Sequence, residues 1–139
     1  MIHIVLASHG RLAASMKESI GLIMGNTDAI TAICAYCEPE EALGDQIDRA
    51  FARFLPEDTV VVVTDVFGGS VNNEFMKYVG RDRLYLIAGM NLPLVIQLVT
   101  MGQQEDMETA LKEILEEARK GMVYCNTLLT ECQADEEDF

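Results

Sequence analysis

Positive charge is scarce in this sequence. Its 139 residues include 10 Lys and Arg against 23 Asp and Glu, which gives a net charge of −13. A strongly acidic surface repels phosphate backbones, so this balance argues against a function in binding nucleic acid. A partner protein with a basic docking patch fits the charge better.

Long apolar runs are also missing, although half of the residues are apolar. No stretch approaches the roughly 20 residues that a membrane-spanning helix needs, so any role at a membrane is expected to act through a partner. The chain opens directly into a strand pattern, with no basic segment ahead of an apolar one. We therefore expect no signal peptide and a cytoplasmic protein.

Cysteine is used sparingly. Cys34, Cys37, Cys125 and Cys132 are expected to be free thiols of a cytosolic protein. The first two lie three residues apart on a predicted strand, which places their thiols on opposite faces. The other two are far away in the sequence and no histidine is nearby, so we expect no zinc site and no other metal.

Short apolar runs alternate with longer segments of helical periodicity, which indicates repeated strand–helix units. Strands are predicted over residues 2–8, 29–37, 59–64 and 84–88, and helices over residues 12–24, 38–55, 70–79, 94–101 and 105–120. Residues 122–129 are a candidate fifth strand. One domain over residues 1–130 is expected, followed by an acidic, disordered tail over residues 131–139.

Strands that are joined by helices imply a parallel sheet with helices on both faces. The predicted fold class is α/β, a flavodoxin-like, doubly wound and mainly parallel sheet with strand order 2-1-3-4. That order creates a switch point between the first and third strands, where ligands collect at the carboxyl ends. His9 follows the first strand and Asp65 follows the third, so the topology predicts that these two side chains lie side by side.

His9 is the first candidate for chemistry. A neutral imidazole nitrogen is a good nucleophile near physiological pH, which suits it to covalent phosphoryl carriage. A single histidine in a turn can also have no role. A carboxylate at its side would hold one ring N–H and leave the other nitrogen free to attack. Asp65 can equally stabilise its own turn, and position alone leaves both interpretations open.

Gly68, Gly69 and Ser70 open a predicted helix after the third strand, with Ser70 as its N-cap. The glycines let the backbone approach a ligand closely, and the free N–H groups with the Ser70 hydroxyl form an anion site, although Gly-Gly-Ser alone is more often a hinge or a cap. Asn91 follows the fourth strand and either bonds into the site or stabilises a left-handed turn. His3 lies within a strand, and we predict a structural role for it.

Three motifs carry a family resemblance. They are Ala7-Ser8-His9-Gly10 after the first strand, Asp65-Val66-Phe67-Gly68-Gly69-Ser70 after the third, and Gly89-Met90-Asn91-Leu92-Pro93 after the fourth. In this order and at these spacings, the sequence resembles the mannose-family enzyme IIA domains of the bacterial phosphoenolpyruvate-dependent sugar phosphotransferase system (PTS). The resemblance covers about residues 1–120.

This resemblance implies a phosphorelay. In the family, a histidine-containing phosphocarrier protein phosphorylates a histidine that matches His9, and enzyme IIB then receives the group and phosphorylates sugar entering through the membrane subunits IIC and IID. The aspartate that orients the histidine matches Asp65, and the anion-binding serine matches Ser70. Gly69 and Ser70 would meet the oxygens of the transferred group. No cofactor is implied. Such domains are homodimers that exchange a C-terminal strand, for which residues 122–129 are the candidate.

Two departures concern the rim of the site. Phe67 stands where many relatives carry Trp, and Val71 stands where many carry Pro. Both residues are expected to keep an apolar rim around the histidine. Phe67 and Asn91 are assigned to the rim that meets the partner protein.

Three other functions compete with this one. A similar domain is the phosphoryl donor of dihydroxyacetone kinases, but the turn from Gly89 to Pro93 favours a sugar-transport IIA protein. A non-catalytic regulatory module that binds an anion or a partner would need His9 only as a hydrogen-bond donor. An aspartyl-phosphate receiver needs acidic residues at the end of the first strand, where Ser8 and His9 stand instead.

Overall fold

The structure is a computed structural model, and it describes residues 1–130. The strands are β1 (Ile2–His9), β2 (Ile30–Ala35), β3 (Thr59–Thr64) and β4 (Leu84–Ala88). The helices are α1 (Leu12–Met24), α2 (Leu43–Phe51), α3 (Ser70–Met76), α4 (Leu92–Thr100) and α5 (Met107–Arg119).

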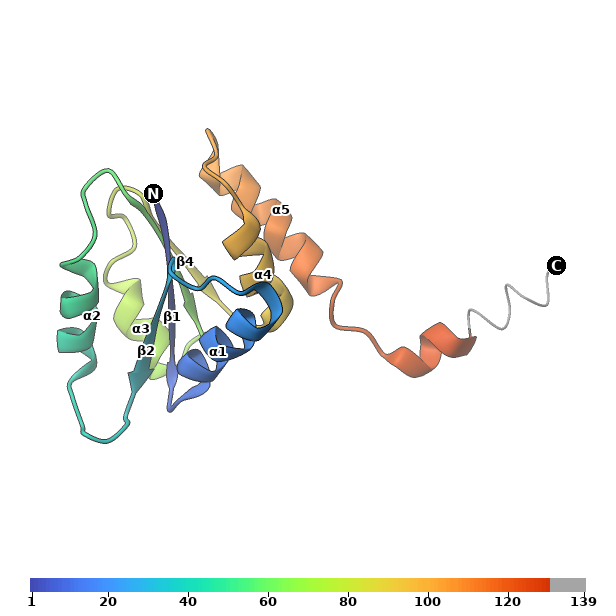
Figure 1. The fold of residues 1–139 in the computed structure, drawn as a ribbon, viewed down its shortest axis with the longest axis horizontal. Helices are drawn as coiled ribbons and strands as arrows, with labels where there is room; N and C mark the ends of the chain where they lie inside the picture. The colour runs from blue at the N-terminus through green and yellow to red at the C-terminus, as the bar shows by residue number, and fades with distance from the viewer. Residues whose placement is uncertain (131–139) are drawn as a thin grey trace.

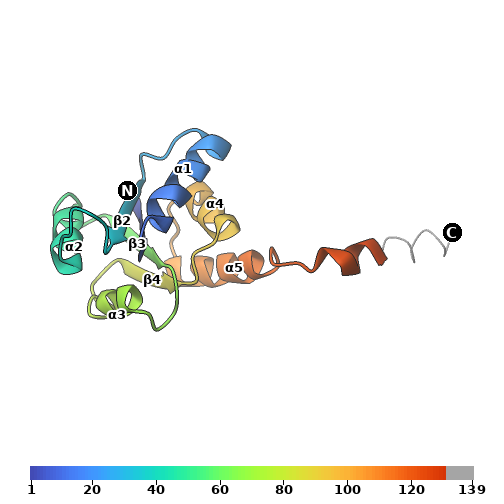
Figure 2. The ribbon, with the colours of Figure 1, turned by 90° about the horizontal axis from the view of Figure 1, so that it is seen from below.

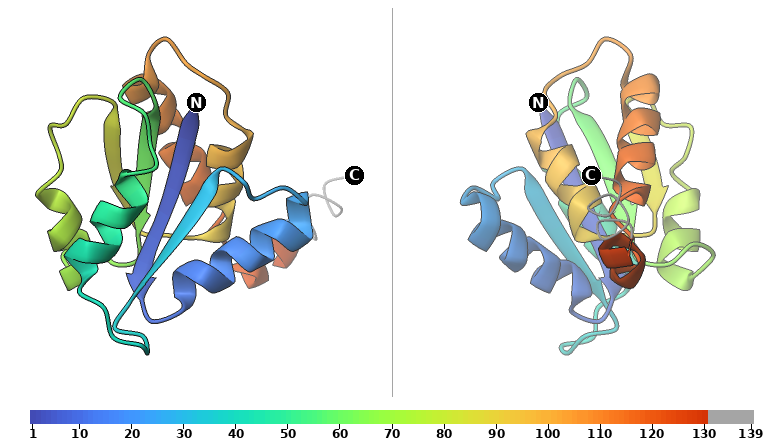
Figure 3. Two further views of the ribbon diagram at one scale, coloured as in Figure 1. Left: turned by 60° about the vertical axis from the view of Figure 1, so that its left-hand side comes forward. Right: turned by 90° about the vertical axis from the view of Figure 1, so that its right-hand side faces the viewer.

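The four strands form one parallel sheet in the order β2-β1-β3-β4, which confirms the predicted class and strand order. Helices α2 and α3 cover one face of the sheet, and α1, α4 and α5 cover the other (Figures 1 and 3). In register, His9 pairs with Ala35 of β2, and Ala7 pairs with Thr64 of β3. The carboxyl ends of β1, β2 and β3 therefore meet at one edge of the sheet.

The alternation of side chains along the strands fills two cores, one on each face of the sheet. Ile4 and Leu6 of β1 pack with Val61 and Val63 of β3 beneath α1, α4 and α5. The second core lies on the opposite face of the sheet. It contains Val5 and Ala7 of β1, Val60 and Val62 of β3, Ile47 of α2 and Phe75 of α3. Every residue of β3 is buried, as its β-branched run predicts for a central strand.

Several helices and strands begin or end at other residues than the sequence predicts. β2 ends at Ala35 rather than at residue 37, because Tyr36 turns the chain with a φ of 62°. Helix α2 begins at Leu43 rather than at residue 38, and Pro39 accounts for the non-helical geometry of the residue before it. Ser70 is the first helical residue of α3, and Gly69 is its N-cap.

The predicted fifth strand is wrong for this single chain. Residues 125–130 are helical, and all of residues 122–130 are exposed in an arm that leaves the end of α5 (Figures 1 and 2). A strand obtains its backbone hydrogen bonds from a neighbour, whereas a helical turn satisfies them locally. Within residues 1–130, β4 pairs only with β3, so the arm has no strand beside it. The predicted tail, residues 131–139, lies outside the described residues.

The sequence also makes predictions about the cysteines, about metal binding and about membrane-spanning helices. Cys34, Cys37 and Cys125 are free thiols, and Cys132 lies outside the described residues. In the described part of the chain, no cluster of three His, Cys, Asp or Glu side chains is arranged to hold a metal ion. Over residues 1–130, none of the helices has the length and apolar character needed to span a membrane.

His3 has the structural role that the sequence predicts. Its Nε2 lies 2.9 Å from Oδ2 of Asp58, and its ring stacks on Phe54 with 4.1 Å between ring centroids. Asp58 also accepts a 2.9 Å hydrogen bond from the Leu55 amide, and the N-terminal ammonium of Met1 lies 3.4 Å from its other oxygen. Asp58 therefore joins the start of β1 to the loop before β3.

We expect the charge of Asp58 to stabilise the fold at neutral pH. The Leu55 amide and then His3 donate hydrogen bonds that lower the pKa of Asp58. Because the folded-state pKa lies below the ordinary value, this stabilisation is present at neutral pH and is lost as the pH falls through the folded-state pKa. Asp58→Asn should therefore lower Tm at pH 7, and the deficit should shrink below about pH 4 in thermal melts. A deficit that stays constant across that range would contradict the charge-based explanation.

Candidate functional site

His9 is the last residue of β1, at the edge where the carboxyl ends of the strands meet. A buried serine shapes the turn that follows it. Ser8 Oγ accepts a 2.8 Å hydrogen bond from the Ala13 amide and donates one of 3.1 Å to the Gly10 carbonyl. The Gly10 amide in turn donates to the Ala35 carbonyl at 2.9 Å. The chain is thus held at the start of α1 while the His9 side chain stays 44% exposed.

Asp65 lies beside His9, as the strand order predicts. Its Oδ2 accepts a hydrogen bond from the backbone amide of His9 and faces the ring Nδ1, both at 2.7 Å. Its Oδ1 accepts a 2.9 Å bond from the Val66 amide. Partial burial acts to raise the pKa of Asp65, but the hydrogen bonds from His9 and Val66 together outweigh it and lower the pKa below its ordinary value. Asp65 is therefore a carboxylate at neutral pH.

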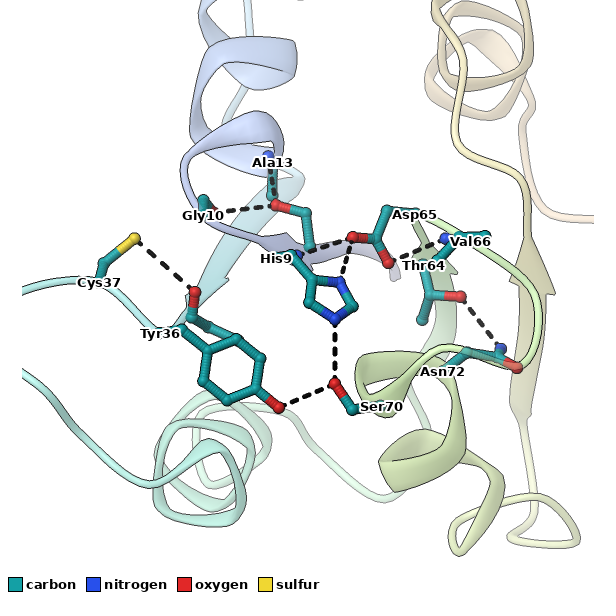
Figure 4. Close-up of polar contacts among 12 residues, drawn as sticks. His9, Gly10, Ala13, Tyr36, Cys37, Thr64, Asp65, Val66, Ser70 and Asn72 are labelled. Atoms are coloured by element: carbon teal, nitrogen blue, oxygen red, sulfur yellow. Dashed lines mark hydrogen bonds and ion pairs between the residues drawn. The ribbon is translucent and has the colours of Figure 1, made fainter.

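The ionised carboxylate determines the direction of the neighbouring hydrogen bonds (Figure 4). A carboxylate only accepts, so the Nδ1–H of His9 donates to Asp65, and in the tautomer that carries its proton there Nε2 is an acceptor. Ser70 Oγ lies 3.0 Å from Nε2 and donates to it. Tyr36 Oη lies 2.8 Å from the same Ser70 Oγ, and its O–H therefore donates to Ser70. One directed chain of hydrogen bonds runs from Tyr36 through Ser70 and His9 to Asp65.

The loop between β3 and α3 is held by a buried amide side chain. Asn72 donates from Nδ2 to Thr64 Oγ1 at 3.0 Å, and its Oδ1 accepts from the Gly68 amide at 3.2 Å. Gly68 has a φ of +80°, a conformation that favours glycine. Gly69 lies so close to the site that an added Cβ would be 3.3 Å from His9 Cε1. These contacts place the start of α3 against the imidazole.

The structure brings together four of the residues that the sequence singles out, His9, Asp65, Gly69 and Ser70. Phe67 is 82% exposed and forms an apolar rim with Val66, which is 54% exposed, on the loop after β3.

Asn91 serves its own turn instead. Its side chain accepts from the Leu94 amide at 3.0 Å as the N-cap of α4 and donates to the Gly89 carbonyl. Its φ of −151° excludes the left-handed alternative. None of its hydrogen bonds reaches His9.

Sequence reasoning missed Tyr36, Ser8 and Asn72. One signal for Tyr36 was available, because residues that follow β2 lie at the same sheet edge as His9. Ser8 and Asn72 hold backbone rather than face the crevice, and serine and asparagine are too common near turns for their positions to stand out.

Known sequences are similar to this chain over most of its length. The sequence profile of the family described as PTS system fructose IIA component matches residues 3–115. The PTS system fructose-specific EIIA component of Bacillus subtilis (strain 168) is 23% identical over 140 residues, which cover 99% of this chain and 96% of that protein. The PTS system sorbose-specific EIIA component of Klebsiella pneumoniae is 22% identical over 99 residues, which cover 71% of this chain and 73% of that protein.

Solved structures agree with these sequences. A crystal structure of a protein provisionally assigned as a phosphoenolpyruvate-dependent sugar PTS permease from Klebsiella pneumoniae superimposes with a TM-score of 0.85 at 38% identity, covering 92% of this chain and 93% of that one. The PTS IIA protein associated with the fucose utilization operon of Streptococcus pneumoniae shares the fold, with a TM-score of 0.76 at 23% identity and coverage of 92% and 96%.

We expect Gly69→Ala to disturb the imidazole without unfolding the protein. The new Cβ would be 2.7 Å from a methyl carbon of Val66 and 3.3 Å from both the Val66 carbonyl oxygen and His9 Cε1, so the Val66 side chain must shift and the imidazole is pressed. Val66 is exposed and free to move, and the backbone of Gly69 has a φ of −73° that alanine adopts readily. The NMR signals of the His9 ring should move while the melting curve changes little.

Gly44→Ala is the matched control, since its Cβ would meet only the end of the Glu74 side chain at 3.9 Å. Unchanged His9 signals in Gly69→Ala would show that the close approach of this glycine does not position the ring.

Proposed function

The chain belongs to the family of PTS system fructose IIA components, and on that premise we propose that it is a phosphocarrier in which His9 accepts a phosphoryl group from the histidine-containing phosphocarrier protein and passes it to enzyme IIB. The observation that carries the proposal is the asymmetric environment of the two ring nitrogens of His9. Nδ1 is held by a carboxylate, while Nε2 faces only a hydroxyl group that can move aside.

In the proposed transfer, the lone pair of Nε2 attacks the phosphorus atom of the donor phosphohistidine. The new N–P bond forms as the donor N–P bond breaks, and the released pair of electrons returns the donor ring to its neutral form. No proton has to leave Nε2, because the ring proton is on Nδ1. The phosphorylated ring carries a positive charge shared over its two nitrogens, which the carboxylate of Asp65 stabilises at 2.7 Å.

Phosphoryl transfer proceeds through a loose, in-line transition state, so positioning and charge stabilisation supply most of the catalysis. Ser70 is placed to turn its O–H from Nε2 to an oxygen of the incoming group. The first turn of α3 begins at the same residue, and its backbone N–H groups have no partner within the helix. Gly69, which has no side chain, leaves room beside His9 Cε1.

The surroundings of His9 suit protein partners. The side chain is 44% exposed, and the adjacent rim of Val66 and Phe67 offers apolar surface for docking. The net charge of −13 would attract a donor with a basic patch and raise the association rate at low salt. We place this relay in the cytoplasm, and its outcome would be sugar uptake through the membrane subunits IIC and IID. Two relatives are named as fructose-specific and sorbose-specific EIIA components, which supports sugar as the final acceptor.

A labelling experiment tests the phosphorylation site. Incubation with radiolabelled phosphoenolpyruvate, enzyme I and the phosphocarrier protein should produce an acid-labile, base-stable phosphoprotein, and His9→Ala should take up no label. His3→Gln removes the other histidine and should keep the label. Label retained by His9→Ala would refute the assignment.

Asp65→Asn tests the role of the carboxylate in the same assay. An asparagine amide can donate to Nδ1, which would favour the tautomer with its proton on Nε2 and block the nucleophile. We expect transfer to slow by about 10²–10⁴-fold, with the circular dichroism spectrum unchanged. Asp82→Asn, an exposed carboxylate in the loop before β4, is the control for the loss of one negative charge. Equal rates in the two variants would remove Asp65 from the mechanism.

The proposal includes a homodimer. Residues 122–130 expose large apolar side chains, with Met122 at 83%, Tyr124 at 73% and Leu129 at 65%. A single chain gains nothing from leaving them in water, and burial against a second copy would remove this cost. Light scattering should give twice the chain mass of 15.4 kDa, and the double variant Met122→Glu/Leu129→Glu should give the mass of one chain. A monomeric wild-type chain would contradict this part of the proposal.

A further inference from the structure

Tyr36 reaches the site from an element that neither His9 nor Asp65 belongs to. It follows the last residue of β2, Ala35, which pairs in register with His9. Its hydroxyl lies 2.8 Å from Ser70 Oγ, and its ring centroid lies 5.5 Å from that of His9, with the planes tilted by 41°. The side chain thus spans from the end of β2 to the start of α3 and passes beside the imidazole (Figure 4).

The backbone of Tyr36 adopts a conformation that its side chain disfavours. Its φ of 62° is in the left-handed region, which is uncommon for residues other than glycine and a clear outlier for a bulky side chain. Core packing does not explain this conformation, because the side chain is 60% exposed. Strained residues of this kind persist where the surrounding structure needs them and gather at functional sites. The contact that this conformation makes is the one with Ser70.

The hydrogen-bond directions show what Tyr36 does to Ser70. Ser70 Oγ has one proton to donate. Two neighbouring groups could accept it, Nε2 of His9 and the Tyr36 hydroxyl oxygen. With Nε2 as an acceptor, the proton of Ser70 is directed at His9, and the Tyr36 O–H donates to a lone pair of the same oxygen, so the Tyr36 oxygen does not draw that proton away. Successive hydrogen bonds in one direction also polarise one another, so the donor that Ser70 presents is strengthened.

We propose that Tyr36 is a positioning residue for the phosphoryl transfer at His9, acting through Ser70. This inference rests on the proposed function. In the free protein, Tyr36 directs the Ser70 hydroxyl at Nε2 and so supports the tautomer that Asp65 selects from the other side of the ring. When the phosphoryl group arrives on Nε2, Ser70 turns its proton to a phosphoryl oxygen, and Tyr36 continues to hold Ser70 Oγ as an acceptor.

The exposed ring of Tyr36 suggests a different role, as part of the apolar surface that the partner contacts. The two roles separate at the hydroxyl group. A docking role depends on the ring and survives Tyr36→Phe, whereas a role through Ser70 depends on the oxygen and is lost. Phenylalanine keeps the ring and makes no new demand on the backbone at φ 62°, so the variant isolates one hydrogen bond.

The first experiment measures the unphosphorylated protein and needs no transfer activity. With ¹⁵N-labelled histidine, at a pH high enough for the ring to be neutral, the Nε2 chemical shift of His9 reports the hydrogen bond from Ser70. Tyr36→Phe should move this shift towards the value of a free imidazole nitrogen, and Ser70→Ala should move it further in the same direction. Tyr78→Phe is the matched control, since Tyr78 packs against Phe51 and Arg81 away from the site. An unmoved shift in Tyr36→Phe overturns the proposal.

The second experiment is a double-mutant cycle on transfer from the phosphorylated phosphocarrier protein. Tyr36→Phe should lower kcat about 3–10-fold with KM for the phosphocarrier protein unchanged, the effect expected of one hydrogen bond between neutral groups. Ser70→Ala should lower kcat further. Because Tyr36 acts through Ser70, the double variant Tyr36→Phe/Ser70→Ala should be no slower than Ser70→Ala within about twofold.

The outcomes separate the inference from the function on which it rests. Multiplied effects in the double variant, or a higher KM with kcat unchanged, would overturn the positioning role in favour of docking. A wild-type protein that takes no phosphoryl group refutes the proposed function and the transfer role of Tyr36 together. The Nε2 shifts would still report in that case whether Tyr36 orients Ser70 at His9.

Discussion

The pair formed by His9 and Asp65 is the interaction on which the rest of the site depends. One carboxylate oxygen accepts from both the backbone amide and the ring of His9, each at 2.7 Å. The backbone bond fixes where the residue lies, and the ring bond fixes which nitrogen carries the proton. Without the carboxylate, the two tautomers of the ring would exchange and Ser70 would face a donor in part of the population. The direction of every hydrogen bond towards Tyr36 follows from this one acceptor.

The fold keeps this pair in place through elements far apart in the sequence. Asp65 follows β3 and His9 ends β1. These parallel strands lie side by side because the sheet order places β3 next to β1, on the side opposite β2. Helices on both faces bury β3 completely, so the strand that Asp65 follows has little freedom to move. Buried polar side chains then complete the turns, Ser8 after β1 and Asn72 after β3. The side chains of His9 and Asp65 are thereby held at the ends of rigid strands. A reaction that depends on positioning requires this.

Local and long-range interactions decide different elements of this fold. The strands β1, β3 and β4 and the helices α1 and α5 follow from apolar periodicity, because burial of one face decides them residue by residue. The start of α2 differs from the prediction, because acidic residues at positions 38, 40 and 41 are typical of a first helical turn, whereas Pro39 disfavours helical geometry in the residue before it. The arm over residues 122–130 was predicted as a strand from its apolar residues. Strand formation needs a neighbour, and residues 1–130 of one chain place no strand beside this arm.

The sequence by itself determined the fold class, the strand order expected of it, and the meeting of His9, Asp65 and Ser70 at one sheet edge. These follow from periodicity, from the rules of parallel sheets and from three motifs in order, all of which are properties of the chain read in one dimension. Only the tertiary structure decided that Tyr36 joins their hydrogen bonds and that Asn91 bonds within its own turn. Both depend on where a side chain points after a turn, Tyr36 by a left-handed φ of 62° and Asn91 by capping its own helix. Side-chain direction at a turn follows from backbone angles that packing selects, which residue identity alone does not specify.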